Sequence, residues 1–172
     1  SAQCTDERVN KVTPMLFQRF QTVHDYAEAT QEEVTRYVES VNFFRNKSRH
    51  IRESAKMIVE RFGGEVPRTM AQLLELPGVA RKTANVVLAV AYGIIEGVVV
   101  DTHVRRLSGR LGLSKQKDPN KVERDLMKLL PRKEWDHFSM LLIWHGRRVC
   151  RARRAYCEKC VVNEMCPSAF RV

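Results

Sequence analysis

The chain has 172 residues, of which 44% are hydrophobic and 29% are charged, a composition that fits a folded protein and excludes a largely disordered one. No apolar run approaches the ~20 residues needed to cross a bilayer, and no charged-then-apolar leader is present, so we expect neither a membrane protein nor a secreted one. Lys and Arg number 30 against 20 Asp and Glu, and the formal net charge of +10 favours a polyanionic partner, most often nucleic acid. The alternative at this point is a soluble protein with a merely basic surface.

Helical patterns dominate the first half of the sequence. Thr5 begins an amphipathic segment that extends to Phe20, and Thr30 with Glu33 forms a capping box that opens a second helix. Both patterns predict helices with one apolar face.

Residues 42–45, Asn-Phe-Phe-Arg, predict a break that carries two adjacent aromatic side chains. A longer helix is expected from about Asn46 until the Gly-Gly pair at 63–64, and a short helix from Thr69 to about Leu76.

The second half of the sequence also consists mainly of helical patterns. Residues 81–92 predict a helix, residues 98–100 form a short strand-like valine run, and Asp101 lies where an N-cap would open the next helix. Asp118 followed by Pro119 opens another helix, and a last long helix holds residues 135–144. The predicted fold class is therefore all-α.

The charge is unevenly distributed along the chain. Residues 1–95 carry 13 basic and 11 acidic side chains, whereas residues 96–172 carry 17 and 9. This break near residue 95 is our predicted domain boundary, which gives domains 1–95 and 96–172. Five arginines of the second half fall within eight residues and predict an anion-facing surface: Arg147, Arg148, Arg151, Arg153 and Arg154.

Four of the five cysteines lie within the last 23 residues, in the pattern C-x6-C-x2-C-x5-C: Cys150, Cys157, Cys160 and Cys166. Two disulfides are possible, but such a cluster in a chain without secretory features more often holds a metal. A zinc ribbon normally has two C-x-x-C pairs and this chain has one, so an iron–sulfur cluster is favoured over zinc. The fifth, Cys4, is expected to be a packed side chain.

A tight turn, Leu-Pro-Gly-Val-Ala at 76–80, joins the short helix to the helix that begins at Arg81. Gly78 permits a backbone conformation that other residues rarely adopt. The turn leads into a helix N-terminus, whose free N–H groups and dipole favour an anion such as a DNA phosphate. Leu-Pro-Gly alone is also a common helix connector.

The whole segment 74–84, Leu-Glu-Leu-Pro-Gly-Val-Ala-Arg-Lys-Thr-Ala, resembles the helix–hairpin–helix of the endonuclease III family of DNA glycosylases. The resemblance continues through residues 82–88, Val-Asp-Thr-His at 100–103, and His-Gly-Arg at 145–147 into the cysteines. Residues 1–6, Ser-Ala-Gln-Cys-Thr-Asp, are similar to another motif of the family, so the likeness covers nearly the whole chain.

The resemblance implies a base-excision repair enzyme that removes oxidised pyrimidines from duplex DNA and then cleaves the strand at the abasic site. It implies two all-α lobes with DNA between them: a six-helix barrel with the helix–hairpin–helix (1–95) and a lobe (96–172) whose four cysteines hold a [4Fe–4S] cluster. The expected partner is double-stranded DNA with a damaged base or abasic site, bound by a monomer. We expect a cytoplasmic, nucleoid-associated protein if it is bacterial, and a nuclear or mitochondrial one if it is eukaryotic.

Two residues match the family's catalytic positions. Asp101 is the carboxylate that would stabilise positive charge on the sugar, and Lys82 is the amine that would attack C1′ and form a Schiff base. A lysine nucleophile must be deprotonated, and the positive potential at a helix N-terminus favours its neutral form. On residue type alone, Lys82 could be a solvent-facing charge and Asp101 a helix cap.

DNA contacts follow from the same resemblance. Gln3 would enter the space left by a flipped base, and Asn42 with Phe43 would form a wedge, although Phe44 could equally be core. The remaining candidates would contact phosphates, through backbone amides in the hairpin and through side chains near the cysteines: Gly78, Val79, Ala80, Arg81, Arg148, Arg151, Arg153 and Arg154.

The sequence departs from the family pattern in three places. Ala80 replaces the usual second hairpin glycine, and Asn42-Phe43 differs from the commoner small-then-aliphatic wedge. The family normally has a helix before the Ser-Ala-Gln motif, and we expect that helix to be absent from this sequence.

Three rival interpretations remain open. An adenine-mispair glycosylase of the same superfamily lacks the hairpin lysine, so Lys82 argues against it. A non-catalytic DNA-binding module would need neither Lys82 nor Asp101 at these positions. A structural zinc in place of the iron–sulfur cluster is the third.

Overall fold

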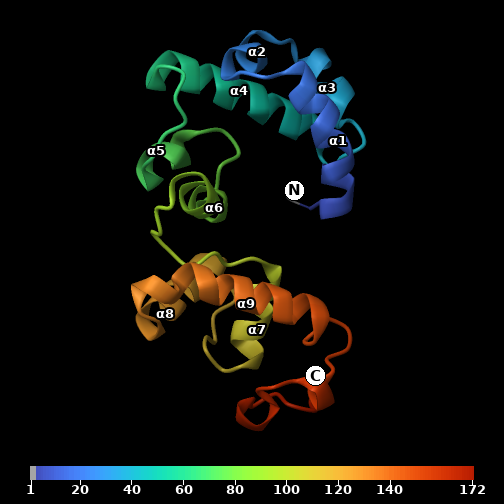
Figure 1. Cartoon of the computed structure of the whole chain (residues 1–172), viewed down its shortest axis with the longest axis vertical. Helices are drawn as coiled ribbons and strands as arrows, with labels where there is room; N and C mark the ends of the chain where they lie inside the picture. The colour runs from blue at the N-terminus through green and yellow to red at the C-terminus, as the bar shows by residue number, and fades with distance from the viewer. Residues whose placement is uncertain (1–2) are drawn as a thin grey trace. The chain divides into compact units, whose positions relative to one another are not determined.

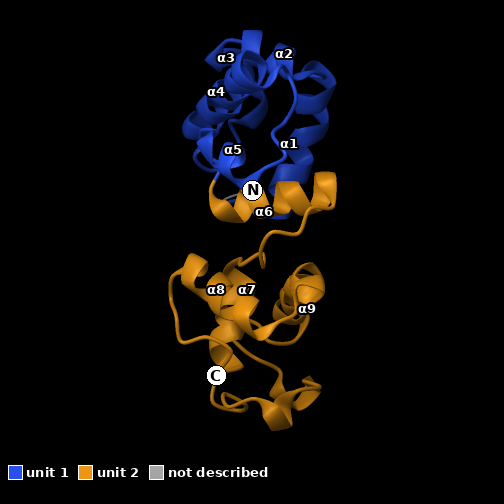
Figure 2. Cartoon of the chain, turned by 90° about the vertical axis from the view of Figure 1, so that its left-hand side faces the viewer, with its two compact units in different colours: residues 1–79 blue, residues 80–172 orange. Residues whose placement is uncertain are grey.

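The structure is a computed structural model that describes residues 3–172 (Figure 1). Within that part of the chain, all regular secondary structure is helical, which confirms the all-α fold class. None of the described helices is long and apolar enough to cross a membrane. The chain forms two compact units, residues 1–79 and 80–172, coloured blue and orange in Figure 2.

Unit 1 contains five α-helices: α1 (Asp6–Arg19), α2 (Val23–Glu28), α3 (Gln31–Val38), α4 (Phe44–Phe62) and α5 (Met70–Glu75). The capping box of Thr30 and Glu33 is formed as expected. Its core is built from apolar side chains of α1, α3 and the segment between them, with aromatic rings packed around Phe20: Leu16, Phe20, Ala29, Val34 and Val38.

Unit 2 contains four α-helices and three short 3-10 turns: α6 (Arg81–Tyr92), α7 (Thr102–Arg110), α8 (Pro119–Leu129), η1 (Arg132–Glu134), α9 (Trp135–Arg148), η2 (Cys157–Lys159) and η3 (Asn163–Met165). Its core combines one face each of α7, α8 and α9 with two valines of the preceding segment: Val98, Val100, Val104, Leu107, Val122, Leu126 and Leu142.

The structure differs from the sequence predictions at three points. The units divide at residues 79/80 and not at the charge break near 95, so α6, which hydrogen-bonds to Glu123 of α8, belongs to unit 2. Helix α2 was not predicted, although Thr22 and Asp25 form a capping box. The valines at 98–100 are buried but form no strand in the described part of the chain. This run is therefore apolar because it lies in the core, and not because it belongs to a sheet.

Candidate functional site

The hairpin turn in unit 1 requires the glycine at its centre. Val79 N–H donates to the Leu76 carbonyl (3.1 Å), and the Ser54 hydroxyl donates to the Pro77 carbonyl (3.0 Å), which fixes the turn against α4. Gly78 has φ +78°, and a Cβ built there would lie 2.5 Å from Nδ1 of His50. Both backbone conformation and space therefore exclude a side chain at this position.

We expect Gly78→Ala to destabilise the protein. The left-handed conformation alone costs about 1–2 kcal/mol for a residue with a Cβ, and displacement of the His50 ring adds to this. Chemical denaturation should show the loss as a lower unfolding midpoint. The matched control is Gly109→Ala in α7, where no atom lies within 4 Å of the built Cβ and φ is not positive. The prediction fails if the two variants have the same midpoint.

Lys82 lies in the first turn of α6 and is exposed. The N-cap residue is Ala80, whose side chain makes no capping hydrogen bond. The amides of this turn are therefore not occupied by a capping side chain, and the helix dipole is positive there. An exposed amine at such a place is accessible to a substrate.

Arg81 is held inside unit 2. Its Nε donates to the Glu123 carboxylate at 2.7 Å, and Asn85 Nδ2 donates to the other carboxylate oxygen at 2.8 Å. Glu123 is only 3% exposed. Sequence reasoning missed this residue because it sits in an ordinary amphipathic helix, and Arg81 as a phosphate contact stays a prediction.

Asp101 is the N-cap of α7, as the sequence predicted. One carboxylate oxygen, Oδ1, accepts from Val104 N–H at 2.8 Å, and the residue is half-buried. Val100 before it and Val104 after it belong to the core of unit 2. The helix cap and the core thus fix the carboxylate in the unit that also carries Lys82.

Gln3 and the predicted wedge lie together in unit 1, although 39 positions separate Gln3 from Asn42. Asn42 Nδ2 donates to the Gln3 carbonyl at 2.7 Å. Gln3 (φ 57°) and Phe43 (φ 59°) both adopt a left-handed conformation, and Phe43 is 62% exposed. Phe44, by contrast, packs on the core. That conformation is uncommon for a bulky residue, and together with its exposure it makes Phe43 a candidate functional residue. The first two residues of that N-terminal motif, Ser1 and Ala2, lie outside the described residues.

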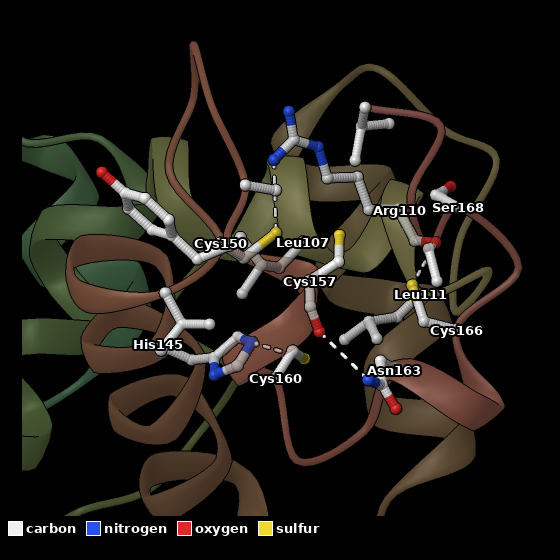
Figure 3. A pocket seen from close by; sticks show the side chains of 15 residues that line it. Leu107, Arg110, Leu111, His145, Cys150, Cys157, Cys160, Asn163, Cys166 and Ser168 are labelled. Carbon is white, nitrogen blue, oxygen red and sulfur yellow. Dashed lines mark hydrogen bonds between the residues drawn. The ribbon is translucent and has the colours of Figure 1, made fainter.

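The four C-terminal cysteines line one pocket of unit 2 (Figure 3). None forms a disulfide, and they come from the end of α9, η2 and the loops that follow. No three His, Cys, Asp or Glu side chains among residues 3–172 are grouped so as to bind one metal ion. The thiols therefore surround a space and do not converge on a point.

Each of the four sulfurs has a polar neighbour: Arg110 Nη1 3.2 Å from Cys150, Phe170 N 3.3 Å from Cys157, His145 Nε2 3.4 Å from Cys160, and the Arg110 carbonyl 3.5 Å from Cys166. Burial lowers the pKa of His145 below its usual value. A four-thiol set in which Arg110 and the Phe170 amide direct N–H groups at two of the sulfurs fits an iron–sulfur cluster, because such contacts stabilise thiolate ligands.

The arginine loop between Cys150 and Cys157 is tied to α7 by one side chain. Arg110 donates to the carbonyls of Arg151 (2.8 Å) and Ala152 (3.1 Å). The outward cations rest on aromatic rings: Arg148 on Trp144, and Arg151 and Arg154 on Tyr156. With Arg153 they are all exposed. These arginines are thus exposed and anchored, and their role as an anion-facing, DNA-contacting surface stays a prediction.

Comparison with known proteins assigns the family. The family model described as HhH-GPD superfamily base excision DNA repair protein matches residues 1–132. An endonuclease III of Synechocystis sp. is 57% identical over 98% of this chain and 77% of the relative, and one of Bacillus subtilis is 44% identical over 96% and 76%. The chain belongs to the HhH-GPD superfamily of base excision DNA repair proteins and, within it, to the endonuclease III family.

Comparison with solved structures supports the same family assignment. A non-covalent endonuclease III–DNA complex superposes with a TM-score of 0.93 at 42% identity, over 99% of this chain and 80% of that chain. A trapped covalent endonuclease III–DNA intermediate matches equally well, over 98% and 79%. A thermostable thymine-DNA glycosylase at 22% identity shares the fold.

Proposed function

We propose that this protein is a bifunctional glycosylase and abasic-site lyase of base-excision repair, which removes oxidised pyrimidines from duplex DNA as a monomer. The observation that carries the proposal is the pair in unit 2: an exposed lysine in the uncapped first turn of α6, and a carboxylate fixed at the N-cap of α7. The covalent intermediate of an endonuclease III relative supports a nucleophilic route.

The chemistry divides between the two residues. The neutral Lys82 amine attacks C1′, and the C1′–N bond breaks with its electron pair leaving on the base, which is then protonated. The positive charge that develops on the sugar is stabilised by the Asp101 carboxylate. The amine then loses a proton, and its lone pair forms the C1′=N bond of an iminium, or Schiff base, as the C1′–O4′ bond breaks and O4′ takes up the bonding pair and a proton. Removal of a C2′ proton then expels the 3′ phosphate by β-elimination, and water releases Lys82.

DNA is held by groups of two kinds. The hairpin from Gly78 to Ala80 and the exposed arginines would contact phosphates, which positions the duplex without reading its sequence. Gln3 and Phe43 would fill and wedge the stack from which the damaged base is extruded. The hydrogen bond from Asn42 to Gln3 would hold these two insertion residues in register.

Phe43→Gly should separate DNA binding from stability. Glycine relieves the left-handed strain, so the free energy of unfolding should stay equal or rise by about 1 kcal/mol. Affinity for a lesion duplex, measured by fluorescence anisotropy, should fall about 5- to 150-fold through the loss of ~1–3 kcal/mol of stacking. Phe170→Gly is the matched control, because Phe170 is also exposed (70%) with φ 59°. Equal affinity of Phe43→Gly and wild type would contradict the wedge.

The cysteine pocket would hold a [4Fe–4S] cluster through Cys150, Cys157, Cys160 and Cys166. The bound cluster would supply Fe–S bonds that staple the C-terminal loops, and with them the arginine loop. The protein as isolated should be brown, with iron and acid-labile sulfide in equal amounts and a broad absorption in the visible blue. Cys160→Ser should reduce that absorption, and Cys4→Ser should not. A colourless protein that contains zinc would contradict the cluster.

The function itself is tested on two duplexes, one with a single thymine glycol and one with a plain abasic site. The proposed enzyme cleaves both, and borohydride traps it on either substrate. An adenine-mispair glycosylase would form no adduct with either duplex and would release base only from a third duplex that holds a mispaired adenine. A DNA-binding module would bind both duplexes and cleave neither.

A further inference from the structure

The most deeply buried carboxylate with no place in the chemistry above is Glu123, on α8. It is 3% exposed, and the helix residues around it, Val122 and Leu126, are fully buried in the core of unit 2. A buried charge destabilises a protein unless it is paired and hydrogen-bonded. The hydrogen-bond partners of Glu123 therefore indicate which part of the protein this carboxylate positions.

Both partners of Glu123 lie on the helix that carries the lysine nucleophile. Arg81 (Nε, 2.7 Å) is the first residue of α6, and Asn85 (Nδ2, 2.8 Å) lies four residues later on the same face. Residues i and i+4 are neighbours on a helix surface, so one carboxylate grips the first two turns together. Lys82 is the residue next to Arg81.

Space around the carboxylate is closed. Gly97 lies against it, and a Cβ built on Gly97 would overlap Glu123 Oε1 and come within 2.9 Å of Asn85 Nδ2. The glycine backbone thus packs directly against the carboxylate and the amide, and no side chain fits between them. Close packing of this kind favours a single arrangement of the three groups.

The first turn of α6 has no capping side chain. Its N-cap, Ala80, provides no side-chain hydrogen bond, and an uncapped helix end tends to fray. Asp101, by contrast, is fixed by its own capping bond and by the flanking core valines. Glu123 connects the first turn of α6 to the core that holds Asp101, since its helix neighbours belong to that core and its carboxylate bonds to α6.

We propose that Glu123 is a positioning residue for the nucleophile: through Arg81 and Asn85 it fixes the first turn of α6 and so sets Lys82 in register with the core that holds Asp101. This inference rests on the proposed Schiff-base function. Displacing a reacting group by about 1 Å can slow a reaction about 100-fold, so a loosened first turn should affect the covalent step more than DNA binding.

The test compares Glu123→Gln with Asp125→Asn, a control on the same helix whose carboxylate accepts a hydrogen bond from the Ser114 hydroxyl at 2.6 Å. Two quantities are measured: the single-turnover rate of borohydride trapping on an abasic duplex at saturating enzyme, and the Kd for a duplex with a reduced, uncleavable abasic site. We expect trapping by Glu123→Gln to slow by about 10- to 100-fold with Kd within about threefold of wild type, and no change for Asp125→Asn.

Arg81→Lys provides a second variant that keeps the positive charge and removes the Nε donor; the Arg81 side chain is 35% exposed, so folding should survive. It decides the question if Glu123→Gln does not fold, and its trapping rate should fall in the same direction. The inference is overturned if the trapping rates match wild type, if Kd weakens in proportion to the rate, or if Asp125→Asn slows trapping equally. If wild type itself forms no adduct, it is the proposed function that fails.

Discussion

Lys82→Ala should abolish the covalent adduct. Without the amine no Schiff base forms, so borohydride trapping and strand cleavage at an abasic site should fall at least about 1,000-fold, as expected when a nucleophile is removed. Binding to a duplex with an uncleavable abasic analogue should change by no more than about threefold, since one of many cations is lost. Gel analysis of trapped complexes measures the first quantity, and anisotropy measures the second.

The matched control is Lys128→Ala, which removes an exposed lysine near the end of α8 in the same unit. It should trap like wild type. Adduct formation by Lys82→Ala at a rate near that of wild type would show that another amine is the nucleophile and would refute the assignment of Lys82.

Asp101→Asn should separate two roles of one side chain. Asparagine caps helices about as well as aspartate, so the free energy of unfolding should stay within about 0.5 kcal/mol of wild type. The negative charge that stabilises the developing sugar cation is lost, so release of thymine glycol in single turnover should slow by about 100- to 1,000-fold.

Asp101→Ala completes the comparison. It loses the charge and also the hydrogen bond to Val104 N–H, so it should lower the free energy of unfolding by about 1 kcal/mol in addition to the slower base release. If Asp101→Asn releases thymine glycol as fast as wild type, Asp101 is a structural cap only. Thermal or chemical unfolding of both variants distinguishes a folding defect from a chemical one.

The residues with a local signal were predicted well. The capping residues Thr5, Thr30, Asp101 and Asp118 all cap the helices expected of them, because an N-cap bond is made within three residues of the chain. Gly78 adopts the positive φ predicted for its turn. These features depend on neighbours in the sequence, and so the sequence alone could show them.

The features that were missed depend on distant neighbours. Glu123 looks like one more charge on an amphipathic helix, and nothing near it in sequence indicates that Arg81, 42 positions away, is its partner. Nor does the local sequence indicate the partner of Asn42, whose side-chain amide donates to the Gln3 carbonyl, 39 positions away. The unit boundary was placed near residue 95 for the same reason: net charge describes a surface, whereas the division at 79/80 reflects which parts of the backbone pack together.

By itself, then, the sequence determined the helical class, the caps, the hairpin, the cysteine spacing and, through its motifs, the family. Each of these is encoded by residues a few positions apart. Only the tertiary structure decided that the four thiols surround one pocket, that Arg110 ties the arginine loop to α7, and that a buried glutamate grips the helix of Lys82. Those contacts join distant parts of the chain, and their partners are selected by burial and by hydrogen bonding that no local pattern encodes.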